Sequence, residues 1–259
     1  MKHKFAAQLT TVRELVKQDF PGTLRELKAM GWPAVQISRL WGWDAREIAA
    51  VLQETGLQVA GMHVALDRLI DELDKVLEEA VLFNTKDIVL KGLPGKTHNP
   101  SDFVSARFLL NELARKLAPQ GYRISYHNHD FELQTNIEGK SALEFLLEPT
   151  EDNLLLAEID VYWVKKGGRD TVEFLKPYAH RMPIIHLKDM TNDEAQTFAE
   201  IGTGTIDFEP ILRWGEQSGI EWYAVEQDKC PGHPMDSMQI SLDNLNRLAD
   251  RIQKQGHAV

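Results

Sequence analysis

The feature that most constrains the fold of this chain is a regular alternation of short apolar runs with longer amphipathic stretches. The apolar runs are four to eight residues long and rich in Val, Ile, Leu or Tyr, as expected of buried β-strands. They predict eight strands, at residues 5–9, 34–38, 58–64, 87–91, 122–127, 154–160, 183–187 and 222–226.

The stretches between these runs carry apolar residues at helical spacing, and several have recognisable ends. Asp44 is placed to cap a helix that Gly56 ends, and Gly31 stops the helix before it. The predicted helices lie at residues 23–30, 45–55, 66–82, 100–117, 141–147, 171–178, 208–218 and 237–253.

Strands and helices in strict alternation predict an α/β protein with a parallel sheet, because each parallel pair needs a crossover of this length. For a chain of 259 residues, the expected arrangement is a single (β/α)8 TIM-barrel domain over residues 1–259. A doubly wound open sheet is the alternative. Against it, no predicted strand leads into a Gly-rich nucleotide-binding loop.

The net charge of the chain limits the classes of molecule that it is expected to bind. A formal net charge of -10 opposes binding to phosphate backbones and anionic membranes, so we expect neither nucleic acid nor a membrane as partner. The sequence has no apolar run of about 18 residues, and the basic start of the chain is not followed by the apolar segment of a secretory signal. Cys230 is the only cysteine, which fits a reducing compartment. We therefore expect a cytoplasmic location.

Polar side chains gather where the predicted strands end. The carboxyl ends of barrel strands meet at one mouth, and TIM-barrel active sites lie there. Imidazole and carboxylate groups together suit Mn²⁺, Zn²⁺, Co²⁺, Fe²⁺ or Ni²⁺, and Mg²⁺ less well. The residues at these ends are His63, Lys91, the segment 126–132, Glu158, Asp160, His186, Lys188, Asp189, Glu226 and Asp228.

Three of these residues are the first candidates for the metal and the base, although each has an ordinary structural alternative. Asp160 could cap the next turn, His186 could be a hydrogen-bonded core histidine, and Glu226 could pair with a lysine at the rim. We favour Asp160 and His186 as metal ligands, and Glu226 as ligand or base.

Other residues at the mouth are candidates for contact with the substrate. Lys188 shares the inward phase of His186, because strand side chains alternate with a period of two. His63 and Lys91 end neighbouring strands, and Trp163 is expected to stack on the apolar face of a sugar.

Four motifs resemble those of the sugar phosphate isomerase/epimerase family, within the xylose-isomerase-like, endonuclease-IV-like barrel superfamily. They occur in order at residues 126–132 (YHNHDFE), 158–164 (EIDVYWV), 186–189 (HLKD) and 225–228 (VEQD). Residues 5–14 (FAAQLTTVRE) and 202–208 (GTGTIDF) also resemble the opening strand and the loop before the last helix of that family.

The resemblance implies one divalent metal ion, usually Mn²⁺-like, held by residues from strands five to eight. Asp160, His186 and Glu226 match the last three ligands. His127 stands where relatives place a glutamate, so either His127 or the nearby Glu132 completes the set. We favour Glu132, because a third carboxylate neutralises the ion better. His127 or His129 then contacts the substrate, and His127, Lys188 and Glu226 are the expected catalytic residues.

The function expected first is a metal-dependent isomerase or epimerase of a free or oxidised sugar, in which a carboxylate removes a proton next to a polarised carbonyl. The alternative is a lyase or dehydratase acting on a keto-inositol or a 3-keto-glycoside, since a missing strand-five glutamate removes the second base. An abasic-site endonuclease is disfavoured by the net charge, and a non-catalytic sugar-binding barrel is a further alternative. The expected partner is a small carbohydrate, and homo-oligomers are common among such barrels.

Overall fold

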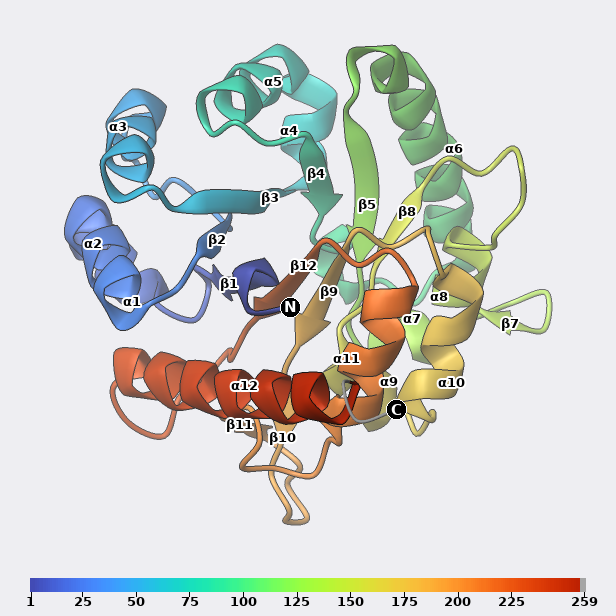
Figure 1. The fold of residues 1–259 in the computed structure, drawn as a ribbon. Helices are drawn as coiled ribbons and strands as arrows, with labels where there is room; N and C mark the ends of the chain where they lie inside the picture. The colour runs from blue at the N-terminus through green and yellow to red at the C-terminus, as the bar shows by residue number, and fades with distance from the viewer. Residues whose placement is uncertain (257–259) are drawn as a thin grey trace.

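The computed structural model describes residues 1–256 and shows a barrel of eight parallel strands surrounded by helices (Figure 1). Each barrel strand lies within one of the predicted segments, so the predicted (β/α)8 TIM barrel is confirmed. The strands are β1 (Phe5–Gln8), β2 (Ala34–Ile37), β3 (Gln58–Val64), β4 (Asp87–Leu90), β5 (Arg123–His127), β8 (Leu156–Glu158), β9 (Ile184–Leu187) and β12 (Trp222–Val225).

The strands pair in the order β8-β5-β4-β3-β2-β1-β12-β9, which leaves β8 and β9 at the two ends of the sheet. These two ends meet. The backbone N–H of His186 donates to the carbonyl of Ile159 at 2.9 Å, and Asp160 and His186 form an isolated parallel bridge. The barrel is thereby closed just where two candidate metal ligands lie.

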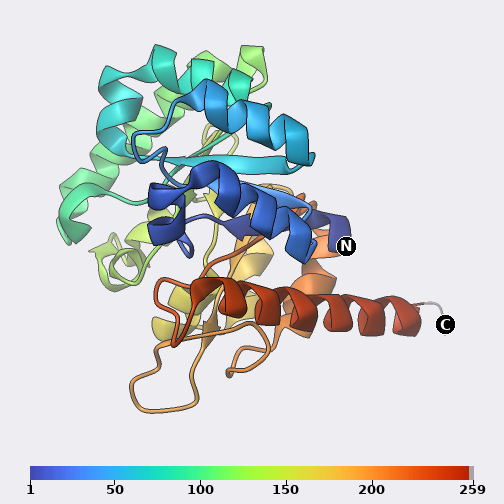
Figure 2. The same cartoon turned by 90° about the vertical axis from the view of Figure 1, so that its left-hand side faces the viewer.

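The helices lie outside the strands, and the last one, α12, packs against the N-terminal turn η1 (Lys2–Lys4) and α11. Figure 2 shows α12 running along one side of the molecule. Within residues 1–256, no helix has both the length and the apolar character needed to cross a membrane. The helices are α1 (Arg13–Gln18), α2 (Phe20–Met30), α3 (Ala45–Thr55), α4 (Leu66–Asp71), α5 (Leu73–Leu82), α6 (Pro100–Leu117), α7 (Phe131–Gln134), α8 (Ala142–Leu146), α9 (Val161–Lys166), α10 (Thr171–Leu175), α11 (Phe208–Gln217) and α12 (Pro234–Gly256).

The helix predicted over residues 66–82 is interrupted at Glu72, whose φ of -128° and ψ of 28° are not helical. Arg68 in α4 pairs with Glu72 at the break and with Glu79 in α5, at 3.0 and 2.9 Å. The sequence pattern also missed short elements beside the barrel mouth, because segments this short carry too little periodicity to recognise. They are α1, α7, α9 and the two-stranded pairs β6 (Asn136–Ile137) with β7 (Lys140–Ser141) and β10 (Asp189–Met190) with β11 (Phe198–Ala199).

The barrel interior is apolar at its amino-terminal end and polar toward the mouth. Small and aliphatic inward-facing side chains pack around the half-buried Trp222 at the apolar end. Two residues further along the same strands, the inward positions are polar: Gln8 follows Ala6, and Gln36 follows Ala34. The same step places His186 and Glu226 in the buried upper interior. Strand periodicity alone therefore delivers the polar groups to one level of the barrel.

The loop over residues 200–206 is held by one buried carboxylate, that of Asp189. Its Oδ2 accepts from the backbone N–H groups of Gly202 and Gly204 at 2.9 and 3.0 Å, and its Oδ1 accepts from those of Met190 and Ile206 at 2.8 and 3.0 Å. A Cβ on Gly204 would lie only 2.2 Å from the Met190 carbonyl oxygen, so the glycine permits this close approach. Asp189 is therefore a structural residue that shapes the loop beside the mouth.

We expect Asp189→Asn to lower the free energy of unfolding by about 2–4 kcal/mol, because an amide group would face two N–H donors that a carboxylate accepts. Urea titration followed by circular dichroism measures this change. The matched control is Asp44→Asn, where asparagine caps a helix as well as aspartate does and the change should be close to zero. Equal stability of the two variants would contradict the role assigned to Asp189.

Candidate active site

The carboxylate of Glu158, at the end of β8, lies in the middle of a buried polar group inside the barrel. Its Oε1 is 2.7 Å from His63 Nε2 and 2.6 Å from His186 Nε2, while Oε2 accepts from Gln36 Nε2 at 2.9 Å. His127 Nδ1 lies 3.4 Å from the same Oε1. These partners come from β2, β3, β5 and β9, so one carboxylate links strands on all sides of the barrel.

A second buried group, nearer the mouth, consists of His127, Asp160, His186 and Glu226. One potential ligand atom from each residue lies within 4.8 Å of the others. His186 Nδ1 is 3.4 Å from Glu226 Oε2. Among the described residues, neither His186 Nδ1 nor His127 Nδ1 has a hydrogen-bond partner, although both atoms are buried.

Both groups contain residue types that bind metal ions, and the distances between their atoms distinguish them. Ligands about 2.1 Å from a tetrahedral ion lie about 3.4 Å apart, whereas hydrogen-bonded atoms lie about 2.7 Å apart. Glu158 is hydrogen-bonded to His63 at 2.7 Å and lies 2.6 Å from His186 Nε2, and both distances are too short for two ligands of one ion. The 3.4 Å spacing and the unpartnered Nδ1 of His186 instead suit a divalent ion in the upper group.

The ammonium group of Lys188 lies against the upper group and is almost fully buried. Its Nζ is 2.8 Å from a carboxylate oxygen of each of Asp160, Glu226 and Asp228. It also lies 5.6 Å from the ring centroid of Trp163. Burial lowers the pKa of Lys188, but the three carboxylates outweigh burial and raise it well above its usual value, so the side chain is a cation.

The imidazoles differ in charge because their neighbours differ. Burial, followed by the neighbouring His186, lowers the pKa of His127 well below its usual value, so His127 is neutral. Burial also lowers the pKa of His186, but Glu158 and Glu226 outweigh it and raise that pKa to about 10. Burial opposes ionisation of Glu158, yet His186 and His63 hold its pKa well below the usual range. The barrel centre thus stabilises the Glu158 anion beneath the upper group.

The structure does not bring Glu132, the favoured strand-five ligand in the sequence analysis, into this group. Its Oε1 accepts from the Tyr126 hydroxyl at 2.9 Å, and its Oε2 accepts from the backbone N–H of His129 at 2.8 Å. Glu132 is the second residue of the short helix α7, whose direction turns its side chain back onto β5. The position beside Asp160 is occupied by His127, the alternative that the sequence left open.

The remaining predicted site residues lie around the mouth. His63 belongs to the Glu158 group rather than to the surface of the site. His129 is half-buried, with its ring centroid 5.2 Å from that of His127 and 5.9 Å from that of Trp163. Lys91 is half-buried at the end of β4, and burial, followed by the positive charge of Arg39, lowers its pKa.

Sequence reasoning missed the central role of Glu158, of its partner Gln36 and of Gln8, which contacts His63. The sequence analysis places Glu158 at a strand end but assigns a role only to Asp160. The two residues are two apart on the same strand end, so strand periodicity places both inside the barrel. The two-residue spacing of Glu158 and Asp160 could therefore have identified Glu158 as an inward-facing residue. Gln8 and Gln36 give no such signal, because a glutamine at a strand end is not expected to be a metal ligand or a base.

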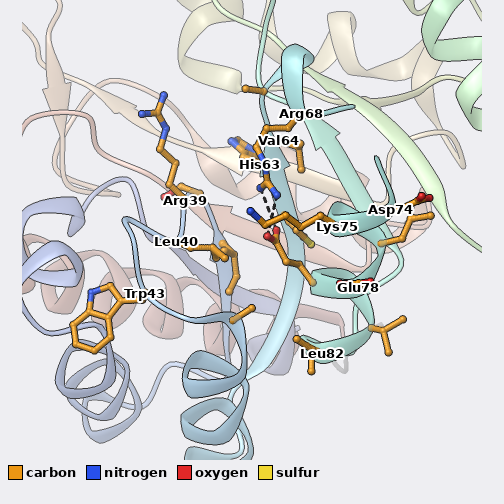
Figure 3. A pocket seen from close by; sticks show the side chains of 18 of the residues that line it. Arg39, Leu40, Trp43, His63, Val64, Arg68, Asp74, Lys75, Glu78 and Leu82 are labelled. Atoms are coloured by element: carbon orange, nitrogen blue, oxygen red, sulfur yellow. Dashed lines mark hydrogen bonds and ion pairs between the residues drawn. The ribbon is translucent and has the colours of Figure 1, made fainter. Parts of the chain in front are cut away.

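A groove of about 1430 Å³ opens beside the site, between α3 on one side and α4 and α5 on the other (Figure 3). It extends from Arg39 and Lys91 at the strand ends to Lys75 and Leu82 on α5. Of the two buried groups in the described chain, only His63 lines it. The groove therefore runs past the site on its β2–β4 side and is not the metal pocket itself.

Comparison with known proteins agrees with this architecture. The family described as xylose isomerase-like TIM barrel matches residues 24–251. An inosose dehydratase of Clostridium botulinum (strain Alaska E43) is 30% identical, over 82% of this chain and 83% of its own length.

Two solved structures share the fold. A sugar phosphate isomerase/epimerase from Parabacteroides distasonis has a TM-score of 0.78 and 18% identity, over 93% of this chain and 97% of that one. The IOLI protein, solved with a bound zinc atom, has a TM-score of 0.75 and 15% identity, over 96% of this chain and 99% of that one. Because the family match covers most of the barrel, the chain belongs to the xylose isomerase-like TIM barrel family.

Proposed function

We propose that this protein is a metal-dependent lyase that removes water from a cyclic polyhydroxy ketone of the keto-inositol class. The sequence alone favours an isomerase or epimerase, with the lyase as alternative. The similarity to an inosose dehydratase over most of both chains supports the lyase. So does the buried pair of Lys188 and Glu226, 2.8 Å apart, which is the observation that carries the proposal.

We assign His127, Asp160, His186 and Glu226 as the residues that would hold one divalent ion. When bound, the ion polarises the substrate carbonyl and so acidifies the neighbouring C–H bond. Two imidazoles beside two carboxylates suit Zn²⁺ or Mn²⁺ better than Mg²⁺. The zinc atom in the structurally similar IOLI protein supports a metal of this kind.

Elimination of water needs a base that removes the proton next to the carbonyl and an acid that protonates the departing β-hydroxyl. Glu226 and Lys188 supply both. Glu226 takes the proton from the carbon next to the carbonyl, and the released electron pair forms the new C=C bond. The C–O bond to the β-hydroxyl then breaks, and Lys188 protonates the departing oxygen to give water. Since Glu226 and Lys188 are 2.8 Å apart, the proton held by Glu226 passes to Lys188 and restores both groups.

The metal ligands can be tested by a matched pair of substitutions, one at the end of β5 and one in α7. We expect His127→Gln to weaken Zn²⁺ or Mn²⁺ binding by at least about 100-fold, because it removes a ligand. Glu132→Gln should leave the affinity within about threefold, since Glu132 bonds only Tyr126 and His129. Competition with a chromophoric chelator gives both affinities. The reverse order would make Glu132 the strand-five ligand.

The reaction class can be tested with 2-keto-myo-inositol and the metal-loaded protein in D₂O. We expect a product lighter by one water, detected by mass spectrometry, together with the absorbance of a conjugated ketone. Recovery of an isomer with deuterium at carbon and no loss of water would instead establish an isomerase or epimerase.

The roles of acid and base can be separated with Lys188→Met. We expect kcat for elimination to fall by about 10²–10⁴, while exchange of the substrate C–H with solvent deuterium continues, because the base remains. Lys165→Met is the matched control, since Lys165 bonds the carbonyl of Thr205 rather than any of the proposed ligands. Loss of both exchange and elimination in Lys188→Met, with metal content unchanged, would make Lys188 the base.

A further inference from the structure

We infer that Glu158 is a positioning residue, which together with Gln36 and Gln8 determines the ring nitrogen on which His186 and His63 carry hydrogen. This inference rests on the proposed metal site. It assigns to a carboxylate outside that site the task of keeping His186 Nδ1 free as a ligand. Two kinds of group in this arrangement have a fixed hydrogen-bonding direction: a backbone N–H only donates, and an ionised carboxylate only accepts.

The first chain of bonds begins at Thr10. Its backbone N–H donates to Gln8 Oε1 at 2.7 Å, so the Gln8 amide nitrogen points the other way, toward His63 Nδ1 at 3.2 Å. His63 Nδ1 must therefore accept, and its hydrogen is on Nε2. That hydrogen is donated to Glu158 Oε1 at 2.7 Å. The backbone N–H of Thr10, in the loop after β1, thus determines which ring nitrogen of His63, on β3, carries hydrogen.

The second chain begins at Glu158 itself. Because the carboxylate accepts, Gln36 must present its amide nitrogen to Oε2 at 2.9 Å, which turns Gln36 Oε1 toward His186 Nε2 at 2.7 Å. His186 therefore carries hydrogen on Nε2, and Glu158 Oε1 also lies 2.6 Å from that nitrogen. Nδ1, which faces Glu226, is then the nitrogen that can give up its hydrogen and bind the metal.

Burial isolates most of this arrangement from solvent. Gln8, Gln36, Glu158 and His186 are 0% exposed, so bulk water is not at hand to replace a partner that one of them loses, whereas His63, 8% exposed, reaches the groove. The two groups hydrogen-bonded to Glu158, one on each oxygen, are both donors: His63 on Oε1 and Gln36 on Oε2. Both terminal atoms of the side chain at position 158 must therefore accept hydrogen bonds. The two oxygens of glutamate do so, whereas one of the two terminal atoms of glutamine is a donor.

The test is an exchange of the carboxylate and the amide. In Glu158→Gln, the new amide hydrogens face Gln36, whose amide must then rotate and present its own hydrogens to His186 Nε2. That favours hydrogen on His186 Nδ1 and blocks the ligand. We expect Zn²⁺ affinity to fall by about 10–100-fold. In the double variant Glu158→Gln with Gln36→Glu, the direction of every bond is restored, and we expect most of the affinity to return.

The matched control is Glu79→Gln, because Glu79 is also a buried glutamate but pairs with Arg68 on the outside of the barrel. It should bind Zn²⁺ like the wild type. Equal affinity of wild type and Glu158→Gln would overturn the inference, and so would failure of the double variant to bind better than the single one. Circular dichroism of each variant separates lost binding from lost folding.

A second measurement does not depend on the variants or on metal binding. Long-range ¹H–¹⁵N correlation spectra of the metal-free wild type report which ring nitrogens carry hydrogen. We expect hydrogen on Nε2 of both His63 and His186, and none on Nδ1 of His63. Absence of hydrogen from either Nε2 would overturn the inference. Wild-type protein that shows these hydrogens but binds neither Zn²⁺ nor Mn²⁺ would overturn the proposed function instead.

Discussion

Closure of the barrel between β8 and β9 is the interaction on which the site depends. The two strands stand at opposite ends of the sheet order and meet through few backbone bonds, among them the one from His186 to Ile159. The same junction sets Asp160 beside His186 as an isolated bridge. Two of the proposed ligands are therefore neighbours because the sheet is cylindrical. In an open doubly wound sheet, strands at the two edges would lie far apart.

Closure also explains how a charged residue can lie at the barrel centre. Burying a carboxylate is costly unless several donors surround it. Glu158 receives hydrogen bonds or close approach from side chains on β2, β3, β5 and β9, a set that only a closed barrel can direct at one point. The strand that supplies Glu158 forms one side of the junction with β9. The cost of burying this anion is thereby offset by contacts that also hold the barrel together.

The sequence predicted the fold well because the fold follows from periodicity. All eight barrel strands fall within the predicted segments, and the inward phase of His186 correctly places Lys188 inside the barrel. The choice between His127 and Glu132 could not be made in the same way. It depends on the direction of α7, a four-residue helix without a periodic signal that turns Glu132 back onto Tyr126. The roles of Gln8 and Gln36 appear only when β1, β2 and β3 are placed side by side.

Charge links the histidine at position 127 to the proposed chemistry. In the proposed site, the two negative charges of Asp160 and Glu226 balance the charge of one divalent ion. The positive charge of Lys188 is paired with the carboxylate of Asp228 as well. A third carboxylate on β5 would leave the centre negative and reduce the polarisation of a bound carbonyl. It would also supply a second base. The neutral His127 leaves the ion more electrophilic and leaves Glu226 as the base, next to an ammonium group at 2.8 Å. Such a centre can remove a proton and assist a leaving group, but it lacks a carboxylate on β5 to return the proton from the opposite face. In the proposed site, a histidine rather than a carboxylate at position 127 thus favours elimination over epimerisation.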